Sequence, residues 1–470
     1  MAKMEVGLQA IRDVLGATGY TDSSPDIDIY QKEWRGLWTG QCDLVAKPST
    51  VDQVSAVVHI CHKHNIPVVP QGGNTGLVGG SVPHGGIVLS TERLNKIREI
   101  DPVNGTISCD SGVILADIQK AADDVDRLFP LSLGAEGSCR IGGNLSTNAG
   151  GVQVLRYGNT RDLALGLEVV LPDGQIWDGM RGLRKDNTGY DLKHMFIGSE
   201  GTLGVITGAV MKLYPKPKQK ETCIVAFESI EKCIELFIRI SSYAGDALTA
   251  FEAMNNLAVS LTVEHGLSTR DPFDQKYAWY ALMELTSPRE GHDLRDAMET
   301  MLGKAFEEGS VIDGVIAESE SQRNDFWRIR ETIPEAQGHV GASIKSDISV
   351  PISRVAEFFQ KANDAMSKVI PGVRFVSFGH IGDGNLHYNL TQPINMSGEE
   401  FLAKWHDATN PMNDIVYSLN GSFSAEHGVG QLKRDELERY RSKVEIKIMK
   451  TVKSALDPKG IMNPKTLFKE

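Results

Sequence analysis

Three glycine-rich stretches decide the fold of this chain: PQGGNTGLVGGS at residues 70–81, LGAEGSCRIGGNLSTNAGG at 133–151 and GSEGTLGVIT at 198–207. They hold five, six and three glycines, with Asn, Ser and Thr residues between them. Glycine lets the backbone approach a ligand closely and adopt positive φ, so that successive N–H groups can converge on a phosphate. One such stretch is typical of an ordinary tight turn, but three in one half of a chain indicate a phosphate-bearing cofactor. The chain has neither a complete GxGxxG nor a GxxxxGK followed by Ser or Thr, which argues against Rossmann NAD and Walker ATP sites.

The composition is globular and acidic. Of 470 residues, 41% are hydrophobic and 23% are charged, and 49 Lys and Arg against 61 Asp and Glu give a net charge of −12. An acidic chain has no general electrostatic reason to bind nucleic acid or an anionic membrane surface. No apolar run reaches the roughly 18 residues of a spanning helix. We therefore expect no nucleic-acid partner, no integral membrane segment, and local cations wherever an anionic substrate binds.

The cysteines and the N-terminus bear on the compartment. The six cysteines all lie in the first half of the chain and form no CxxC. This pattern is typical of reduced, mostly buried thiols in a cytosolic protein, and it argues against a disulfide framework or a cysteine zinc site. The first residues, MAKMEVGLQAIRDVLG, lack the apolar core of a signal peptide and are expected to begin a helix. We therefore expect a cytoplasmic protein.

The order of elements predicts an α+β protein. Up to about residue 215, β-rich runs alternate with glycine turns and with helical stretches at 51–64 and 115–125, the first capped by Ser49 or Thr50. The polar, proline-containing stretch YPKPKQKE at 214–221 indicates a domain boundary. From 222 to about 420 the pattern is that of an antiparallel sheet backed by helices, and a further helix is expected at 443–456. The expected segments are 1–217, 218–420 and 421–470.

The three glycine stretches, in their order and length, resemble the FAD domain of the vanillyl-alcohol-oxidase-type flavoproteins, which have the p-cresol-methylhydroxylase-like fold. GIMNPKTLF at 460–468 resembles the C-terminal signature of that family, so the resemblance covers essentially the whole chain. It implies an FAD-binding domain over 1–217, a substrate domain over 218–420, and a 421–470 segment that completes the active site and the FAD site. It also implies non-covalent FAD, because Asn74 stands where some relatives carry a flavin-linked histidine. The FAD contacts implied by the resemblance are Pro70, Gly72, Gly73, Asn74, Thr75, Gly76, Gly79, Gly80, Ser81, Gly134, Gly137, Ser138, Gly142, Gly143, Asn144, Thr147, Asn148, Gly150, Gly201, Val205, Ile206 and Asn463.

A second group of residues has the chemistry of a metal site. GHIGDGNLHYN at 379–389 places His380 and His387 seven residues apart around a Gly-Asp-Gly turn, and AEHGVG at 425–430 places Glu426 beside His427. Two imidazoles and a carboxylate suit a borderline divalent ion, whether zinc, manganese or iron. The alternative is that these are ordinary hydrogen-bonded histidines, since the chain has 12 histidines in all.

These motifs resemble the D-2-hydroxyacid dehydrogenase branch of the same flavoproteins. The likeness is greatest to its D-2-hydroxyglutarate-oxidising members, with D-lactate dehydrogenases and glycolate-oxidase-like subunits next. The resemblance implies that His380, His387 and Glu426 hold zinc and that His427 is the catalytic base. It implies that Arg330 and Lys345 bind substrate carboxylates, with Asn389 as a polar partner, although such cations also occur on solvated helix faces. One departure is Pro334, which stands where the family has threonine.

The reaction implied by these roles is the oxidation of a 2-hydroxy acid to a 2-oxo acid. The metal lowers the pKa of the C2 hydroxyl, His427 removes its proton, and hydride passes from C2 to flavin N5. Because two cations are available for substrate carboxylates, the expected order of substrate preference is D-2-hydroxyglutarate, then D-malate, then D-lactate. The resemblance further implies electron-transfer flavoprotein or a quinone as acceptor, and a homodimer. Two other classes stay open: a metal-dependent hydrolase with purely structural glycine turns, and a non-catalytic FAD- or nucleotide-binding module.

Overall fold

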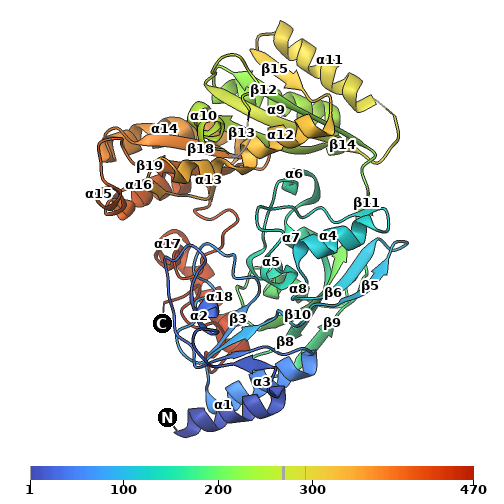
Figure 1. Ribbon diagram of the computed structural model, residues 1–470, viewed down its shortest axis with the longest axis vertical. Coiled ribbons are helices and arrows are strands. Elements are labelled where there is room, and N and C mark those ends of the chain that lie inside the picture. The colour runs from blue at the N-terminus through green and yellow to red at the C-terminus, as the bar shows by residue number, and fades with distance from the viewer. Residues whose placement is uncertain (1, 267–269, 292, 470) are drawn as a thin grey trace. The chain divides into compact units, whose positions relative to one another are not determined.

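The computed structural model describes residues 2–266, 270–291 and 293–469, which form two compact units (Figure 1). The first unit comprises Met1–Gly151, Gly158–Lys216 and Glu426–Glu470, and the second comprises Val152–Tyr157 and Pro217–Ala425. The first unit is therefore discontinuous in sequence, because it begins before the second unit and ends after it.

The first unit contains a small mixed sheet with the strand order β1-β2-β4-β3. Strands β2, β4 and β3 run parallel, so the chain must cross over between them, and the crossover from β2 to β3 is helix α3. Thr50 begins α3 by accepting a hydrogen bond from the Gln53 N–H, and Asn65 ends it in the left-handed conformation. Helices α1 and α3 bury their apolar faces with this sheet in one core. The bounds are α1 (Ala2–Leu15), β1 (Tyr20–Thr21), α2 (Asp28–Gln31), β2 (Leu44–Ala46), α3 (Val51–His64), β3 (Val68–Gln71) and β4 (Ile87–Ser90).

A second, antiparallel sheet of the same unit has the order β5-β6-β10-β8-β9. The second glycine stretch forms helix α5, and the third leads directly into the central strand β10. A short pair, β7 with β11, lies outside both sheets. The bounds are β5 (Ile97–Asp101), β6 (Thr106–Asp110), α4 (Leu115–Asp123), β7 (Arg127–Leu128), α5 (Ile141–Thr147), α7 (Thr160–Leu163), β8 (Ala164–Val170), β9 (Ile176–Gly179), α8 (Lys193–Phe196), β10 (Val205–Lys212) and β11 (Tyr214–Pro215).

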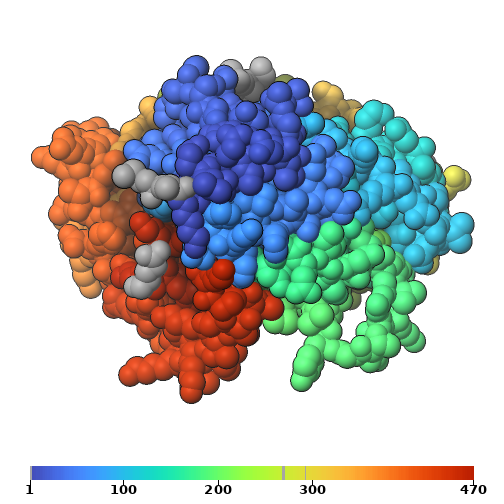
Figure 2. Space-filling model, turned by 90° about the horizontal axis from the view of Figure 1, so that it is seen from below, coloured from blue at the N-terminus to red at the C-terminus, as the bar shows by residue number. Residues whose placement is uncertain are grey.

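The C-terminal segment completes the first unit with α17 (Arg434–Tyr440) and α18 (Lys443–Leu456). After α18 the chain turns around the buried Asp457, whose carboxylate pairs with Lys453 and accepts the N–H groups of Ile461 and Met462. Met462 then bridges to Val68 of β3. The blue N-terminal and red C-terminal surfaces therefore adjoin in Figure 2.

The second unit is an eight-stranded sheet with the order β15-β12-β14-β13-β18-β19-β16, and β17 also pairs with β19. Every pair is antiparallel. Helices α9, α11, α14 and α16 pack on one face, and α10, α12 and α13 pack on the other, which gives two separate cores. The strand bounds are β12 (Gln219–Phe227), β13 (Leu248–Asn255), β14 (Trp279–Ser287), β15 (Asp313–Ile316), β16 (Ser343–Ile344), β17 (Ile348–Ser349), β18 (Arg374–His380) and β19 (Asn385–Thr391). The helix bounds are α6 (Val154–Tyr157), α9 (Ile230–Ala244), α10 (Asn256–His265), α11 (Asp293–Glu307), α12 (Glu320–Glu331), α13 (Ile333–Gly338), α14 (Val355–Val369), α15 (Gly398–Leu402) and α16 (Trp405–Ser418).

Candidate active site

The first two glycine stretches pack against each other within the first unit. A Cβ on Gly73 would lie 2.2 Å from the Ser138 carbonyl oxygen, and a Cβ on Gly142 would lie 2.7 Å from Ser111 Cβ. Both distances are far shorter than a real Cβ contact, so these two positions require glycine for the packing of the protein itself.

Other glycines of these stretches face open space. Among the described residues, no atom lies within 4 Å of a Cβ built on Gly76, Gly134, Gly137 or Gly143. A ligand can therefore approach the backbone closely at these four positions. Gly150 differs, because a Cβ there would lie 2.6 Å from Glu426 Oε1. Glycine at this position therefore makes room for the Glu426 carboxylate.

Buried polar atoms in this region are consistent with a bound cofactor. Ser111 Oγ, Arg140 Nε, Asn144 Oδ1 and Asn463 Oδ1 have no hydrogen-bond partner among the described residues. Buried polar groups are almost always hydrogen-bonded. A flavin dinucleotide offers phosphate oxygens, ribityl hydroxyls and ring amide groups, so both the open glycines and these four atoms fit FAD. Ser111 and Arg140 were missed by the sequence reasoning, although Arg140 stands inside the second glycine stretch.

Several predicted cofactor residues hold the loops in shape. Asn74, in the left-handed conformation, donates from Nδ2 to the Lys32 carbonyl (2.7 Å) and accepts from Ser81 Oγ (2.7 Å). Thr147 Oγ1 donates to the Gly143 carbonyl, and Asn148 Oδ1 accepts the Arg161 N–H.

Four further predicted cofactor residues connect the first and third stretches or belong to the core. A Cβ on Gly201 would lie 3.1 Å from Pro70 Cγ, so the two stretches adjoin there. Val205 and Ile206 are buried in β10.

Asn463 ties the C-terminal segment to two of the glycine stretches. Its Nδ2 donates to the carbonyl oxygens of Gly80 (2.8 Å) and Glu200 (2.6 Å). The Glu200 carboxylate in turn accepts the N–H groups of Val429 (2.8 Å) and Gly430 (2.7 Å). One buried glutamate therefore fixes the chain just beyond Glu426 and His427. Burial raises the pKa of Glu200 to about 7, against the lowering effect of the two N–H donors.

Glu200 predicts a pH dependence of stability. Its ordinary pKa is 4.5, so the folded protein holds this proton more tightly than the unfolded chain. The contribution of Glu200 to stability is full below about pH 4.5 and falls by about 3 kcal/mol as the pH rises to about 7. As the pH rises through this range, we expect the melting temperature of wild type to fall relative to that of Glu200→Gln. Both melting temperatures are measured by flavin fluorescence. A constant difference from pH 4.5 to 7 would contradict the raised pKa.

His380 and His387 lie on one face of a hairpin in the second unit. His380 ends β18, and His387 in β19 pairs with Phe378. Alternate residues of a strand share a face, so Phe378, His380 and His387 point to the same side. The two imidazole ring centroids lie 5.9 Å apart. The turn between the strands requires glycine at Gly384, which has φ +81° and whose Cβ would lie 2.1 Å from the Val350 carbonyl oxygen.

The same face carries Arg330, which reaches the sheet from α12. Its guanidinium lies over the Phe378 ring at 4.7 Å, and its Nε donates to Glu252 Oε2 at 2.8 Å. Glu252 Oε1 lies 2.5 Å from His380 Nδ1. Burial acts to raise the pKa of Glu252, but His380 and Arg330 outweigh it and lower the pKa to about 2. Sequence reasoning missed Glu252, although a lone glutamate in the apolar run LTAFEAM was a usable signal.

Asn389 and Lys345 differ in their surroundings. Asn389 is buried, accepts the Ser346 N–H and donates to Gln337 Oε1 (3.0 Å). Lys345 is exposed in the connection between β16 and β17. Pro334 is exposed in the first turn of α13, where a missing N–H costs no hydrogen bond.

The predicted residues thus divide between the two units. The second unit carries Arg330, Lys345, His380, His387 and Asn389. The first unit carries the FAD contacts together with the half-buried Glu426 and His427. Two imidazoles, one of them fixed by a carboxylate on its other nitrogen, have the donor chemistry of a zinc or similar site, so these residues fit a divalent metal.

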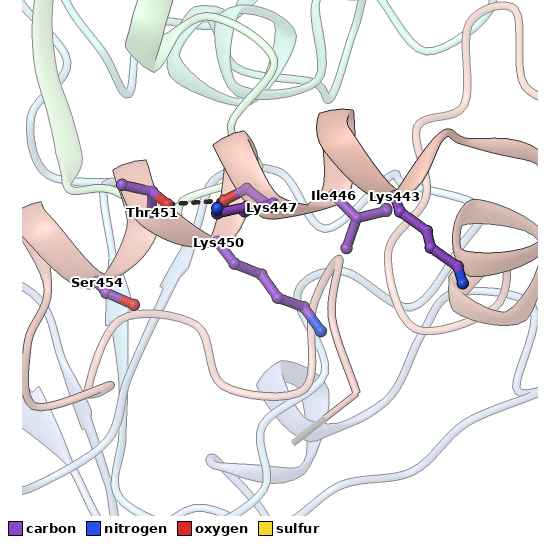
Figure 3. Close-up of a pocket in the computed structure, with 6 residues that line it drawn as sticks. All are labelled: Lys443, Ile446, Lys447, Lys450, Thr451 and Ser454. Atoms are coloured by element: carbon purple, nitrogen blue, oxygen red, sulfur yellow. Dashed lines mark hydrogen bonds between the residues drawn. The ribbon is translucent and has the colours of Figure 1, made fainter.

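A shallow depression on the first unit lies along α18 (Figure 3). The Thr451 hydroxyl in it donates to the Lys447 carbonyl (2.8 Å). The depression contains none of the predicted site residues; it is lined by Lys443, Ile446, Lys447, Lys450, Thr451 and Ser454.

Comparison with known proteins supports the FAD site and the fold. Residues 42–179 match the FAD binding domain, and residues 216–467 match the C-terminal domain of the FAD linked oxidases. The solved structure of p-cresol methylhydroxylase with substrate bound superposes with a TM-score of 0.78 at 18% identity, and covers 99% of this chain and 96% of that one. The predicted α+β, p-cresol-methylhydroxylase-like fold is therefore confirmed.

Curated relatives match over most of the chain. The mitochondrial D-2-hydroxyglutarate dehydrogenase of Arabidopsis thaliana is 38% identical over 96% of this chain and 80% of the relative. The protein of that name from Rattus norvegicus is 39% identical over 93% and 80%. A putative mitochondrial D-lactate dehydrogenase of Schizosaccharomyces pombe is 36% identical over 98% and 89%.

The prediction of a cytoplasmic protein is wrong by this comparison, because these relatives are named as mitochondrial enzymes. The prediction rested largely on the cysteines, which in the structure are six free thiols, five of them buried. A buried free thiol shows that no disulfide has formed and does not identify the compartment.

Among the described residues, no helix is both long and apolar enough to span a membrane. The two matching domains and the relatives agree on the chemistry that the glycine stretches predict. The chain is an FAD-dependent dehydrogenase and belongs to the FAD-linked oxidase family.

Proposed function

We propose that this chain oxidises D-2-hydroxyglutarate to 2-oxoglutarate. The observation that carries the proposal is the state of Arg330, which is 7% exposed and bound through Nε to Glu252. Among the described residues its two Nη groups have no hydrogen-bond partner. A buried guanidinium with both terminal donors available matches a carboxylate bidentately. The Arabidopsis and rat relatives, which are named for D-2-hydroxyglutarate, support this choice of substrate.

The side chains have separate roles in the proposed reaction. The glycine stretches would hold FAD, which would supply the hydride acceptor for the oxidation at C2. His380, His387 and Glu426 would hold a divalent metal, most simply zinc, whose Lewis acidity lowers the pKa of the substrate hydroxyl. His427 accepts the hydroxyl proton, a role that suits imidazole near neutral pH. Arg330, Lys345 and Asn389 orient the anionic substrate.

A dicarboxylate is favoured over D-lactate by the two cations. A monocarboxylate whose carboxylate binds the metal would leave the Nη donors of the buried Arg330 without a carboxylate, which costs on the order of 1–3 kcal/mol. That cost corresponds to about 5- to 150-fold in kcat/KM. We therefore rank D-2-hydroxyglutarate first, D-malate second and D-lactate third. D-lactate oxidation is the second candidate, because the S. pombe relative is named for it.

The experiment is an anaerobic screen of the D and L forms of these three acids, with bleaching of the flavin absorbance as the signal. D-2-hydroxyglutarate should give the highest kcat/KM. Lys345→Met should lower the values for the dicarboxylates more than the value for D-lactate, while the exposed Lys368→Met serves as the control. The assignment fails if D-lactate is the best substrate, or if Lys345→Met affects all three acids equally.

We propose that FAD is held without a covalent bond. Cys139, the thiol inside a glycine stretch, is buried, and burial raises its pKa, so it lacks the thiolate character of a nucleophile. Asn74 offers no nucleophile at all. Acid precipitation should therefore release all the yellow colour into the supernatant, and colour retained in the pellet would show a covalent link.

We also propose an external electron acceptor, either electron-transfer flavoprotein or a quinone, and a homodimeric chain. Turnover with purified electron-transfer flavoprotein should be compared with turnover on a soluble quinone, and light scattering should give the mass of two chains. Turnover on neither acceptor, or the mass of one chain, would contradict the respective proposal.

A further inference from the structure

A single buried carboxylate connects the proposed substrate arginine with a proposed metal-ligating histidine. Glu252 lies in β13 directly opposite His380 in the β13–β18 pair, and it is 1% exposed. Its two oxygens have different partners: Oε1 lies 2.5 Å from His380 Nδ1, and Oε2 accepts Arg330 Nε at 2.8 Å. The carboxylate thus bridges two side chains that come from a strand and from a helix.

The first contact fixes which nitrogen of His380 can bind a metal. A carboxylate only accepts hydrogen bonds, so His380 Nδ1 must carry the proton. With the proton on Nδ1, a metal can be coordinated only through the lone pair of Nε2. Glu252 therefore determines both the tautomer and the orientation of this imidazole.

The second contact fixes the direction of Arg330. Because Nε is bound by Glu252 and the guanidinium lies over Phe378, the planar group is held in one orientation. The carboxylate also compensates a buried positive charge, which is strongly destabilising when left without a partner.

The same helix and sheet provide a matched comparison. Glu284 of the neighbouring strand β14 is 3% exposed and pairs in register with Ala250, two residues from Glu252 on the same face. It accepts Trp327 Nε1 of α12 at 3.0 Å, one helical turn before Arg330. Two buried glutamates thus fasten α12 to the sheet, and only Glu252 also contacts His380.

We propose that Glu252 is a positioning residue that sets the metal-binding nitrogen of His380 and the substrate-binding direction of Arg330 together. This inference rests on the proposed function, and it predicts that one substitution weakens both metal and substrate binding. Glutamine at this position places an N–H donor where His380 Nδ1 needs an acceptor, or else withdraws the acceptor from Arg330. It can satisfy both partners only if the His380 proton moves to Nε2, the nitrogen proposed to bind the metal.

The test uses the FAD-loaded protein and Zn²⁺ alone as the first probe. Zinc affinity is measured by competition with a chromophoric chelator, without substrate. We expect Glu252→Gln to weaken zinc binding 10- to 100-fold, the usual effect of removing such a partner. At saturating zinc we expect its KM for D-2-hydroxyglutarate to rise at least tenfold, with a smaller change in kcat. Glu284→Gln should lower the melting temperature and leave zinc affinity and KM within twofold of wild type.

A further variant and the comparison with Glu284→Gln distinguish failure of this inference from failure of the proposed function. If Glu252→Gln loses its flavin or its cooperative melting, Glu252→Asp replaces it in the test. Aspartate keeps the charge but is too short to reach both partners. We expect Glu252→Asp to weaken zinc binding or substrate binding at least tenfold. Equal zinc affinity and KM in wild type and the Glu252 variants overturn the inference while leaving the proposed function standing. A wild type that is reduced by no hydroxy acid and binds no zinc overturns both. Equal loss of zinc affinity in Glu252→Gln and Glu284→Gln shows a merely structural role and also overturns the inference.

Discussion

His387→Ala should give a yellow protein that has lost at least about 10³-fold of its turnover. The loss follows from removing one of two imidazoles from the proposed metal site, because a Lewis acid at the reacting oxygen contributes several kcal/mol to the barrier. The flavin should remain, since the glycine stretches that fit FAD belong to the first unit and His387 belongs to the second. The measurements are the ratio of flavin to protein absorbance, metal content, and kcat with D-2-hydroxyglutarate.

Removal of the metal should have the same effect as the substitution. EDTA should abolish turnover, and added Zn²⁺ or another divalent ion should restore it in wild type. His339→Ala is the matched control, because its exposed imidazole belongs to the same unit and stacks on His265 outside the proposed site. Full turnover in a metal-free preparation would overturn the proposed role of His380, His387 and Glu426.

The second large effect is expected at His427. His427→Ala should lower kcat by about 10²–10⁴, the usual contribution of a general base. Metal content should stay at the wild-type level, because Glu426 is the proposed ligand.

Glu426→Ala separates the roles of the two neighbours. It should lose metal as well as activity, whereas His427→Ala should lose activity alone. Equal metal loss in both variants would mean that the two roles are assigned the wrong way round.

The sequence could predict those features of the fold that are determined by residues within one short stretch. Helices α3 and α18 have the predicted bounds, because Thr50 and the apolar spacing lie within the stretch itself. The hairpin that carries His380 and His387 could likewise be predicted, because its Gly-Asp-Gly turn lies within the stretch itself. The glycine stretches were recognised as cofactor loops for the same reason.

The residues that were missed are those whose partners are distant in sequence. Glu252 meets His380 across 128 residues, and Glu200 meets Gly430 across 230. No spacing rule connects such positions, and only the pairing of β13 with β18 or the return of the C-terminal segment brings them together. Gly150 likewise has a distant partner that no motif predicts, because a Cβ there would meet the carboxylate of Glu426, far along the chain.

The discontinuity of the first unit sets an order for its assembly during synthesis. All residues of the second unit have been synthesised once Ala425 has been added, and this unit can fold when it has left the ribosome tunnel. The first unit at that stage still lacks α17, α18 and Asn463, although most of its strands were made hundreds of residues earlier. Since Asn463 joins Gly80 to Glu200, the first and third glycine stretches gain this connection only once Asn463 has been made. A chain that stops before Asn463 would lack the side chain that holds the first and third glycine stretches together.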